Sequence, residues 1–243
     1  MYQRIKDICG KIEWLSGAQL KAIAILSMLA DHVNKALIYP NLISNDGLLA
    51  LLSDFFDIIG RIAFPLFCFL LVEGYFKTRS RKKYLLQLLL FGILSEVPFD
   101  MATTASFFNM NWNNVMFTLA FVLITIWSMD VLKEKMQKLP QLLWYFVSIM
   151  IVILMCIAAM YFSLDYEYHA ILIGYFFYLF HDRKLLAILL GYASIYTEPW
   201  SLLGFGLTLI YNGQRGKQYK MLNYWFYPVH LLIIGALRIY LGI

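Results

Sequence analysis

The sequence predicts an all-α membrane protein, a bundle of about nine transmembrane helices with a cytoplasmic N-terminus. Of its 243 residues, 61% are hydrophobic and only 14% are charged. A soluble domain has about 45–50% apolar and about 25% charged residues, so this chain cannot bury its apolar surface in one soluble core. Its positive residues are grouped in short loops between the apolar segments. Such grouping is typical of cytoplasmic loops.

The apolar segments divide into long and short ones. Five long segments come first, at residues 18–38, 48–74, 84–98, 114–129 and 141–162. Three short segments follow at 170–180, 185–196 and 200–211, and a last long one covers 224–241. A helix needs about 20 apolar residues to cross the bilayer, so the short three can also be merged or partly re-entrant. We expect one integral membrane domain over residues 1–243.

The loop charges set the topology. The densest basic loop holds Lys77, Arg79, Arg81, Lys82 and Lys83, and the opposite loops hold Asp46, Asp100, Asp165, Glu167 and Glu198 without Lys or Arg. The positive-inside rule then places the N-terminus inside and the C-terminus outside a plasma membrane. Because the net charge of +5 is explained by these loops, no nucleic-acid partner is expected. Three scattered cysteines, Cys9, Cys68 and Cys156, have no metal-ligand spacing, so no metal is expected.

Asp31 and His32 lie deep in the first apolar segment. A charge at such a depth costs roughly 2.5–3.5 kcal/mol on insertion scales, so ionisable residues there usually face a bundle interior or a watery cavity. Adjacent helical residues do not face each other, which makes Lys35, one turn on, the partner expected for Asp31. His32 is either a packing residue beside that pair or a functional one. Lys21, eleven positions earlier, falls on nearly the same helix face as His32.

Two further ionisable residues within apolar segments, Arg61 and His230, can have either a structural or a functional role. Arg61 cannot in practice lose its proton, and it needs either Asp57 one turn earlier or a buried anion. Pro65 removes the hydrogen bond to the Arg61 carbonyl, so a kinked helix is expected there. His230 in the last segment follows Pro228. Histidine is a general base near neutral pH without any perturbation, and His169 and His181 are interpreted as loop or surface residues.

Four motifs resemble, in order, the TraX family of bacterial membrane proteins. They are residues 20–32 (LKAIAILSMLADH), 60–67 (GRIAFPLF) with 72–75 (VEGY), 95–100 (SEVPFD) and 226–231 (FYPVHL). The family is named for a pilin N-terminal acetylase and is similar to membrane acyltransferases that modify cell-surface glycans. In those, a basic residue precedes a catalytic histidine by eleven positions, as Lys21 precedes His32, and a basic pair lies in a cytoplasmic loop, as Arg79 and Lys82 do here.

The resemblance implies acetyl transfer from cytoplasmic acetyl-CoA to a hydroxyl or amine of an extracytoplasmic protein or glycan. It implies three groups of site residues: catalytic His32, Asp31, Arg61 and His230; coenzyme-binding Lys21, Arg79, Arg81, Lys82 and Lys83; and substrate-side Glu73, Glu96 and Tyr227. His32 is the expected general base, and Arg61 would stabilise developing negative charge. Asp31 and Glu73 would orient the basic groups.

Two other classes of function use the same buried residues. A proton-coupled transporter or flippase would use them as a proton relay or for an anionic ligand; it would depend on the proton gradient and would not bind coenzyme A. An assembly or scaffold protein would tolerate substitution of Asp31, His32, Arg61 and His230. The resemblance favours acetyl transfer over both.

Overall fold

The computed structural model describes residues 13–42, 47–109, 111–138 and 140–243. Cys9 and Asp46 lie outside these ranges. In the part of the chain described, regular structure is helical, apart from the isolated bridges Leu15–Tyr211 and Asn113–Leu164. The all-α prediction is therefore confirmed.

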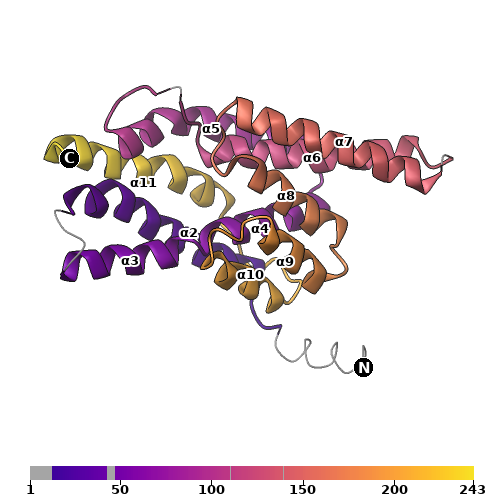
Figure 1. The fold of residues 1–243 in the computed structure, drawn as a ribbon, viewed down its shortest axis with the longest axis horizontal. Helices are drawn as coiled ribbons and strands as arrows, with labels where there is room; N and C mark the ends of the chain where they lie inside the picture. The colour runs from indigo at the N-terminus through magenta and orange to yellow at the C-terminus, as the bar shows by residue number, and fades with distance from the viewer. Residues whose placement is uncertain (1–12, 43–46, 110, 139) are drawn as a thin grey trace. The chain divides into compact units, whose positions relative to one another are not determined.

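The helices follow one another with short connections (Figure 1). In chain order they are α2 (Gly17–Val33), the π-helix η1 (Asn34–Ile38), the 3-10 helix η2 (Tyr39–Asn41), α3 (Leu48–Gly60), α4 (Ala63–Lys77), α5 (Arg81–Thr104), α6 (Val115–Lys135), α7 (Gln141–Tyr161), α8 (Glu167–Leu179), α9 (Lys184–Ala193), α10 (Ser201–Leu209) and α11 (Lys220–Leu241).

Among the described residues, six stretches are long and apolar enough to cross a bilayer. They are Gly17–Asn41, Leu48–Lys77, Arg81–Thr104, Val115–Lys135, Gln141–Tyr161 and Met221–Leu241. The chain is thus a multi-pass membrane protein. The three short predicted segments correspond to α8, α9 and α10, which at 1.5 Å per residue are only about 20, 15 and 14 Å long. Each is shorter than the hydrocarbon core of about 30 Å.

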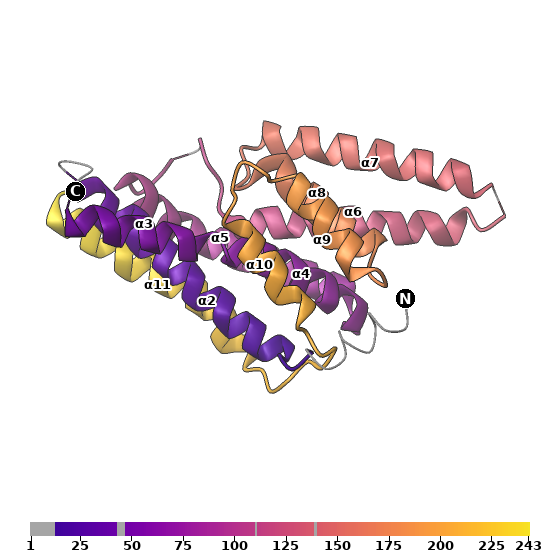
Figure 2. The ribbon, with the colours of Figure 1, turned by 60° about the horizontal axis from the view of Figure 1, so that its bottom comes forward.

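The chain forms two compact units. The first unit takes in the described parts of Met1–Leu70 with Leu94–Asn109 and Ile195–Ile243, and the second Leu71–Ile93 with the described parts of Met110–Ser194. In the first, α2 packs against both α3 and α11 (Figures 1 and 2). In the second, α6 and α7 form a hairpin against which α8 packs, and α9 packs on α8. A single membrane domain over residues 1–243 stays a prediction.

A helix break, and not the expected kink, interrupts the second apolar segment. α3 ends at Gly60 and α4 begins at Ala63, so Pro65 falls in the first turn of α4, where a helix needs no backbone donor. Proline therefore starts a new helix instead of bending an old one. The Ser27 hydroxyl donates to the Ile59 carbonyl (2.6 Å) at the end of α3, and the Ile62 amide donates to the same oxygen (3.1 Å), so this end of the helix is held by both a side chain and the backbone.

Two glycines let neighbouring helices approach this break closely. A Cβ on Gly60 would lie 2.6 Å from Asp31 Oδ1 on α2, and a Cβ on Gly204 of α10 would lie 2.5 Å from the Ile62 carbonyl oxygen. Neither distance is compatible with a side chain in the present backbone. The break is therefore held between α2 and α10. This close packing fixes the backbone position of Arg61, from which its side chain extends.

The outer end of α5 differs from the sequence-based expectation. The helix continues past Pro98 to Thr104, and Asp100, expected in an outer loop, is a buried helical residue that accepts a hydrogen bond from the Asn109 backbone amide (2.8 Å). The Arg238 guanidinium of α11 donates to the Ala102 and Thr103 carbonyls, each at 2.7 Å. The chain leaves the helix at Ala105, which has a positive φ of 54°, and the cation at the last carbonyls stabilises this helix end.

Candidate active site

His32 and His230 come together in the first unit. His32 lies in the last turn of α2, and His230 lies in the middle of α11. The His32 Nδ1 and His230 Nε2 atoms are 2.8 Å apart, and the two rings are nearly parallel, with centroids separated by 5.0 Å. His230 is buried and His32 is half-buried. Two histidines 198 positions apart in sequence therefore form one pair inside the membrane-spanning region.

A backbone carbonyl beside His230 determines which ring nitrogens of the two histidines carry a proton. His230 Nδ1 is 2.7 Å from the Phe226 carbonyl oxygen, and a carbonyl only accepts, so Nδ1 of His230 carries a proton. A neutral His230 then has a bare Nε2, which must accept from His32 Nδ1. Neutral His32 is left with its lone pair on Nε2. Among the described residues, no other hydrogen bond holds the His32 ring.

Aromatic side chains and a π-helix support the pair. The Phe226 ring stacks on His230 at 4.7 Å, and the Tyr227 ring lies edge-on to His230 at 5.7 Å. Phe226 thus fixes His230 with both its carbonyl and its ring. The π-helix η1 begins two residues after His32, and such segments are frequent at functional sites. The Asn34 amide at its start donates to the Ser53 carbonyl (2.9 Å), which ties this end of α2 to α3.

Asp31 faces away from the histidine pair into a cluster of charges. Lys35 Nζ lies 2.9 Å from Asp31 Oδ2, as expected from helix spacing, and Arg61 Nη2 lies 3.5 Å from Asp31 Oδ1. Arg61 also meets Asp57 at 2.5 Å and Glu198 at 3.5 Å. One guanidinium is thus shared by three carboxylates. This leaves Arg61 strongly held at the α3–α4 break, and a direct role in stabilising a reacting oxyanion stays a prediction.

Three more of the predicted residues belong to the first unit. Lys21 on α2 is half-buried, Glu96 on α5 is half-buried, and Tyr227 on α11 is buried beside the histidine pair. Of these, Tyr227 lies nearest the pair, because its ring centroid is 6.3 Å from that of His32. Roles for Lys21 and Glu96 stay predictions.

Glu73, predicted on the substrate side, forms an ionic cluster in the second unit. Its carboxylate meets Lys77 Nζ at 2.6 Å and His181 Nε2 at 2.8 Å. The His181 ring also packs on Phe76, with 4.4 Å between centroids. The cluster therefore connects the end of α4 to the turn after α8.

A second cluster in this unit centres on Asp130 of α6. Arg81 Nη2 lies 2.9 Å from Asp130 Oδ2, the Tyr75 hydroxyl donates to the same oxygen at 2.5 Å, and the Tyr178 hydroxyl donates to Oδ1. The Arg81 guanidinium also lies 4.5 Å from the centre of the Tyr75 ring. Arg81 is thus occupied by protein groups. The other basic residues predicted to bind coenzyme A in this loop, Arg79, Lys82 and Lys83, are exposed.

Comparison with known proteins identifies the family. The TraX protein family model matches residues 16–238, which is most of the chain. The chain belongs to the TraX family. The resemblance predicted from the four motifs is therefore confirmed.

A curated relative of this TraX chain is the probable fimbrial assembly protein FimC, serogroup H1, of Dichelobacter nodosus. The two are 28% identical over 248 residues, which cover 93% of this chain and 97% of the relative. No solved structure matches the chain.

Three polar residues of this TraX chain went unrecognised in the sequence or were assigned to the surface. Glu198 is an Arg61 partner, Asp130 holds two tyrosines and an arginine, and His181 binds Glu73. The role of Asp130 could have been suspected from the sequence, because this acidic residue ends an apolar stretch one turn before the first lysine of the next loop. The contacts of Glu198 and His181 could not have been predicted, because their partners, Arg61 and Glu73, are 137 and 108 positions away in the sequence.

The His181–Glu73 pair makes the second unit sensitive to pH. The hydrogen bond to Glu73 raises the pKa of His181 above its ordinary 6.5, with Asp182 adding to the effect and burial opposing it. A group that binds its proton more tightly in the folded state adds stability below its unfolded pKa and loses it as the pH rises through its folded pKa. We expect the melting temperature of wild type minus that of His181→Gln to be largest near pH 6 and to shrink toward pH 9. Thermal melts of both proteins across that range measure this difference, and a difference independent of pH would contradict the assignment.

Proposed function

We propose that this TraX-family protein is a membrane acetyltransferase in which His32 is the general base and His230 positions it. The observation that carries the proposal is the chain of hydrogen bonds from His32 Nδ1 to His230 Nε2 and from His230 Nδ1 to the Phe226 carbonyl. This chain presents a single basic nitrogen, His32 Nε2, in a fixed orientation. An orienting group behind a histidine base is the arrangement that acyl-transfer enzymes use.

The proposed reaction moves an acetyl group from the thioester of acetyl-CoA to an amine or hydroxyl. His32 Nε2 takes the proton of the acceptor as its nitrogen or oxygen attacks the carbonyl carbon. The carbon–sulfur bond then breaks, and the proton held on Nε2 passes to the leaving thiolate. The ring carries a positive charge between these two steps, and His230 Nε2 accepts from Nδ1 throughout, so that the ring does not rotate.

Binding of the donor is proposed for basic residues. Lys21 on α2, in the same unit as His32, supplies a cation for its phosphates. Arg79, Lys82 and Lys83 are exposed on the loop before or at the start of α5 and are free of ion pairs within the described residues. Arg81 is held by Asp130, which makes it the weakest of these candidates. The acceptor, a pilin-like protein or a surface glycan, is proposed from the family and from the relative named for fimbrial assembly.

A proton-coupled transporter is the second candidate. The cluster of Arg61 with Asp31, Asp57 and Glu198 favours it, because ionisable residues within membrane-spanning segments also form proton relays. The two functions separate in one experiment on protein reconstituted in vesicles. Consumption of acetyl-CoA that continues after a protonophore collapses the gradient supports the enzyme. Substrate movement that stops with the gradient, without consumption of acetyl-CoA, supports the transporter.

The positioning role of His230 has its own test. In His230→Gln the amide oxygen can still accept from His32 Nδ1, whereas His230→Phe offers no acceptor at that place. We expect His230→Phe to lower kcat by about 10- to 100-fold, the scale of a misplaced catalytic group, and His230→Gln to keep most of it. The measurement is thiol release from acetyl-CoA at saturating donor, with similar melting temperatures for both variants. Equal losses of kcat in the two variants would rule out a positioning role for His230 as the hydrogen-bond acceptor of His32.

A further inference from the structure

The segment between α10 and α11 is bound to the start of α2 within the first unit. The Trp14 and Leu15 amides both donate to the Ile210 carbonyl at 3.0 Å. The Asn212 amide donates to the Leu15 carbonyl at 2.9 Å, and the Gly17 amide donates to the Gln214 carbonyl at 2.8 Å. These bonds join the segment that leads into α11 to the start of α2, and α11 itself packs against α2. The two helices therefore begin at the same face of the membrane, which the sequence predicts to be cytoplasmic.

A glycine with positive φ completes this connection. Gly216 has φ +68°, and a Cβ there would lie 2.8 Å from Ser16 Oγ and 2.9 Å from the Ala18 Cβ. The backbone angle favours glycine, and the space admits no side chain. Residues on either side of Gly216 are thereby held in a defined place at the membrane face.

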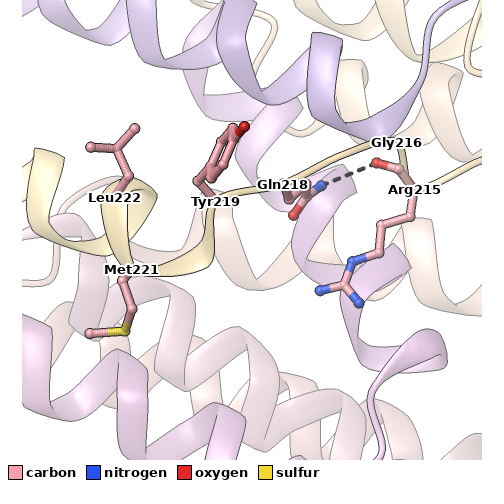
Figure 3. A pocket seen from close by; sticks show the side chains of 6 residues that line it. All are labelled: Arg215, Gly216, Gln218, Tyr219, Met221 and Leu222. Atoms are coloured by element: carbon pink, nitrogen blue, oxygen red, sulfur yellow. Dashed lines mark hydrogen bonds between the residues drawn. The ribbon is translucent and has the colours of Figure 1, made fainter.

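A hollow of about 650 Å³ opens on this segment. It is lined by Arg215, Gly216, Gln218, Tyr219, Met221 and Leu222 (Figure 3). The Gln218 amide donates to the Arg215 carbonyl at 3.3 Å, which closes the turn that forms one side of it. In Figure 3 the Arg215 and Met221 side chains extend to the same side of the segment. The hollow thus joins a cationic end to an apolar end.

Arg215 lines the hollow, and Lys217 lies next to it in the same segment. In the described ranges neither cation has a carboxylate partner: no ion pair holds the Arg215 guanidinium, and Lys217 Nζ lies 5.9 Å from the centre of the Tyr219 ring. Tyr219, Met221 and Leu222 are 64%, 59% and 68% exposed. Trp14 before α2 and Trp225 in the second turn of α11 are exposed as well, and exposed Trp and Tyr near the starts of membrane helices are typical of the boundary between water and lipid. Arg215 and Lys217 therefore lie at the level of the lipid headgroups.

We propose that this hollow binds an anionic phospholipid of the cytoplasmic leaflet. Arg215 and Lys217 contact the headgroup phosphate, and Met221 and Leu222 contact the adjoining acyl chain. Cations beside a membrane-spanning helix attract anionic lipids in this way. The proposal is independent of acetyl transfer, because it concerns only the charge and shape of this segment.

The test measures lipid binding by the full chain in a neutral detergent. Phosphatidylglycerol is titrated against phosphatidylcholine, and bound lipid is counted by native mass spectrometry. We expect wild type to prefer phosphatidylglycerol and Arg215→Gln/Lys217→Gln to bind it about 30-fold more weakly, from the contribution of two cations near a membrane surface. Lys135→Gln/Lys138→Gln, which removes the same charge from another exposed loop, should bind as wild type does.

Two results would overturn the proposal. One is an equal loss of phosphatidylglycerol in both double variants, which would mean that only net charge matters. The other is displacement of the lipid by free coenzyme A together with weaker coenzyme A binding in Arg215→Gln/Lys217→Gln. That outcome would assign the phosphate site to the nucleotide. The melting temperatures of the variants without lipid should match wild type, because neither cation has a carboxylate partner among the described residues and Lys217 meets only the exposed Tyr219 ring.

Discussion

Replacing His32 with alanine should reduce acetyl transfer by about 10²- to 10⁴-fold, the contribution of a positioned general base. The loss should appear in kcat, because the base acts on the reacting proton and holds no part of the donor. Radiolabelled acetyl-CoA with purified protein in nanodiscs measures it, with the labelled product counted after separation from the donor. The expected size is large because the hydrogen bond to His230 fixes the tautomer of His32 and leaves its Nε2 as an oriented base within a membrane-spanning segment.

Misfolding of the His32→Ala variant must be excluded as the cause of a loss of activity. His32 is half-buried and its ring makes one hydrogen bond, so the alanine variant should melt within a few degrees of wild type. His169→Ala provides a matched control, because His169 is held by the Ser194 carbonyl at 2.5 Å in the second unit and has no proposed part in the reaction. Normal activity in His32→Ala, or an equal loss in His169→Ala, would remove His32 as the base.

Replacing Gly204 with alanine should produce the largest loss of stability of any single methyl addition in the first unit. The new Cβ would lie 2.5 Å from the Ile62 carbonyl oxygen and 3.2 Å from its carbon. Both are backbone atoms, which cannot rotate away as a flexible side chain can. Overpacking of this kind costs typically 1–3 kcal/mol and sometimes more. Since Ile62 follows Arg61 directly, the same displacement should move the charge cluster and lower activity.

Gly206, two residues later on the same helix, gives a matched control. A Cβ there meets nothing within 4 Å, and alanine is favoured over glycine in a helix interior by about 1 kcal/mol. Gly206→Ala should therefore melt at or above the temperature of wild type, whereas Gly204→Ala should melt well below it. Thermal unfolding in detergent micelles, monitored by circular dichroism, measures both melting temperatures. If the two substitutions had the same effect, close packing at Ile62 would not be what holds α10 in place.

Much of the fold could be predicted from hydrophobicity, because long apolar segments indicate membrane helices. The first, fifth and last segments are helical at nearly the predicted bounds, whereas the helices of the third and fourth segments, α5 and α6, each continue six residues past the predicted end. The break at Arg61 could not be placed in this way. Pro65 is compatible with both a kink and a new helix, and the choice depends on how closely Gly60 and Gly204 let α2 and α10 approach. That approach is a property of packing between segments distant in sequence.

The candidate site could be predicted as a set of residues but not as a set of contacts. His32, Arg61 and His230 stand out, since each is costly in an apolar segment. Periodicity also pairs Asp31 with Lys35 and Arg61 with Asp57, and both pairs are present. What it cannot provide is the tautomer of His32, because that follows from a carbonyl on a helix nearly two hundred positions away.

The pairing of α2 with α11 has a consequence for the synthesis of this protein. His32 leaves the ribosome 198 residues before His230, yet the two rings share one hydrogen bond. A chain that has inserted α2 but not α11 therefore holds His32 without the acceptor that fixes its Nδ1 proton. With His32 as the proposed base, we expect activity to be acquired only when α11 is inserted, and a chain truncated before α11 to be inert even if everything before it were correctly inserted.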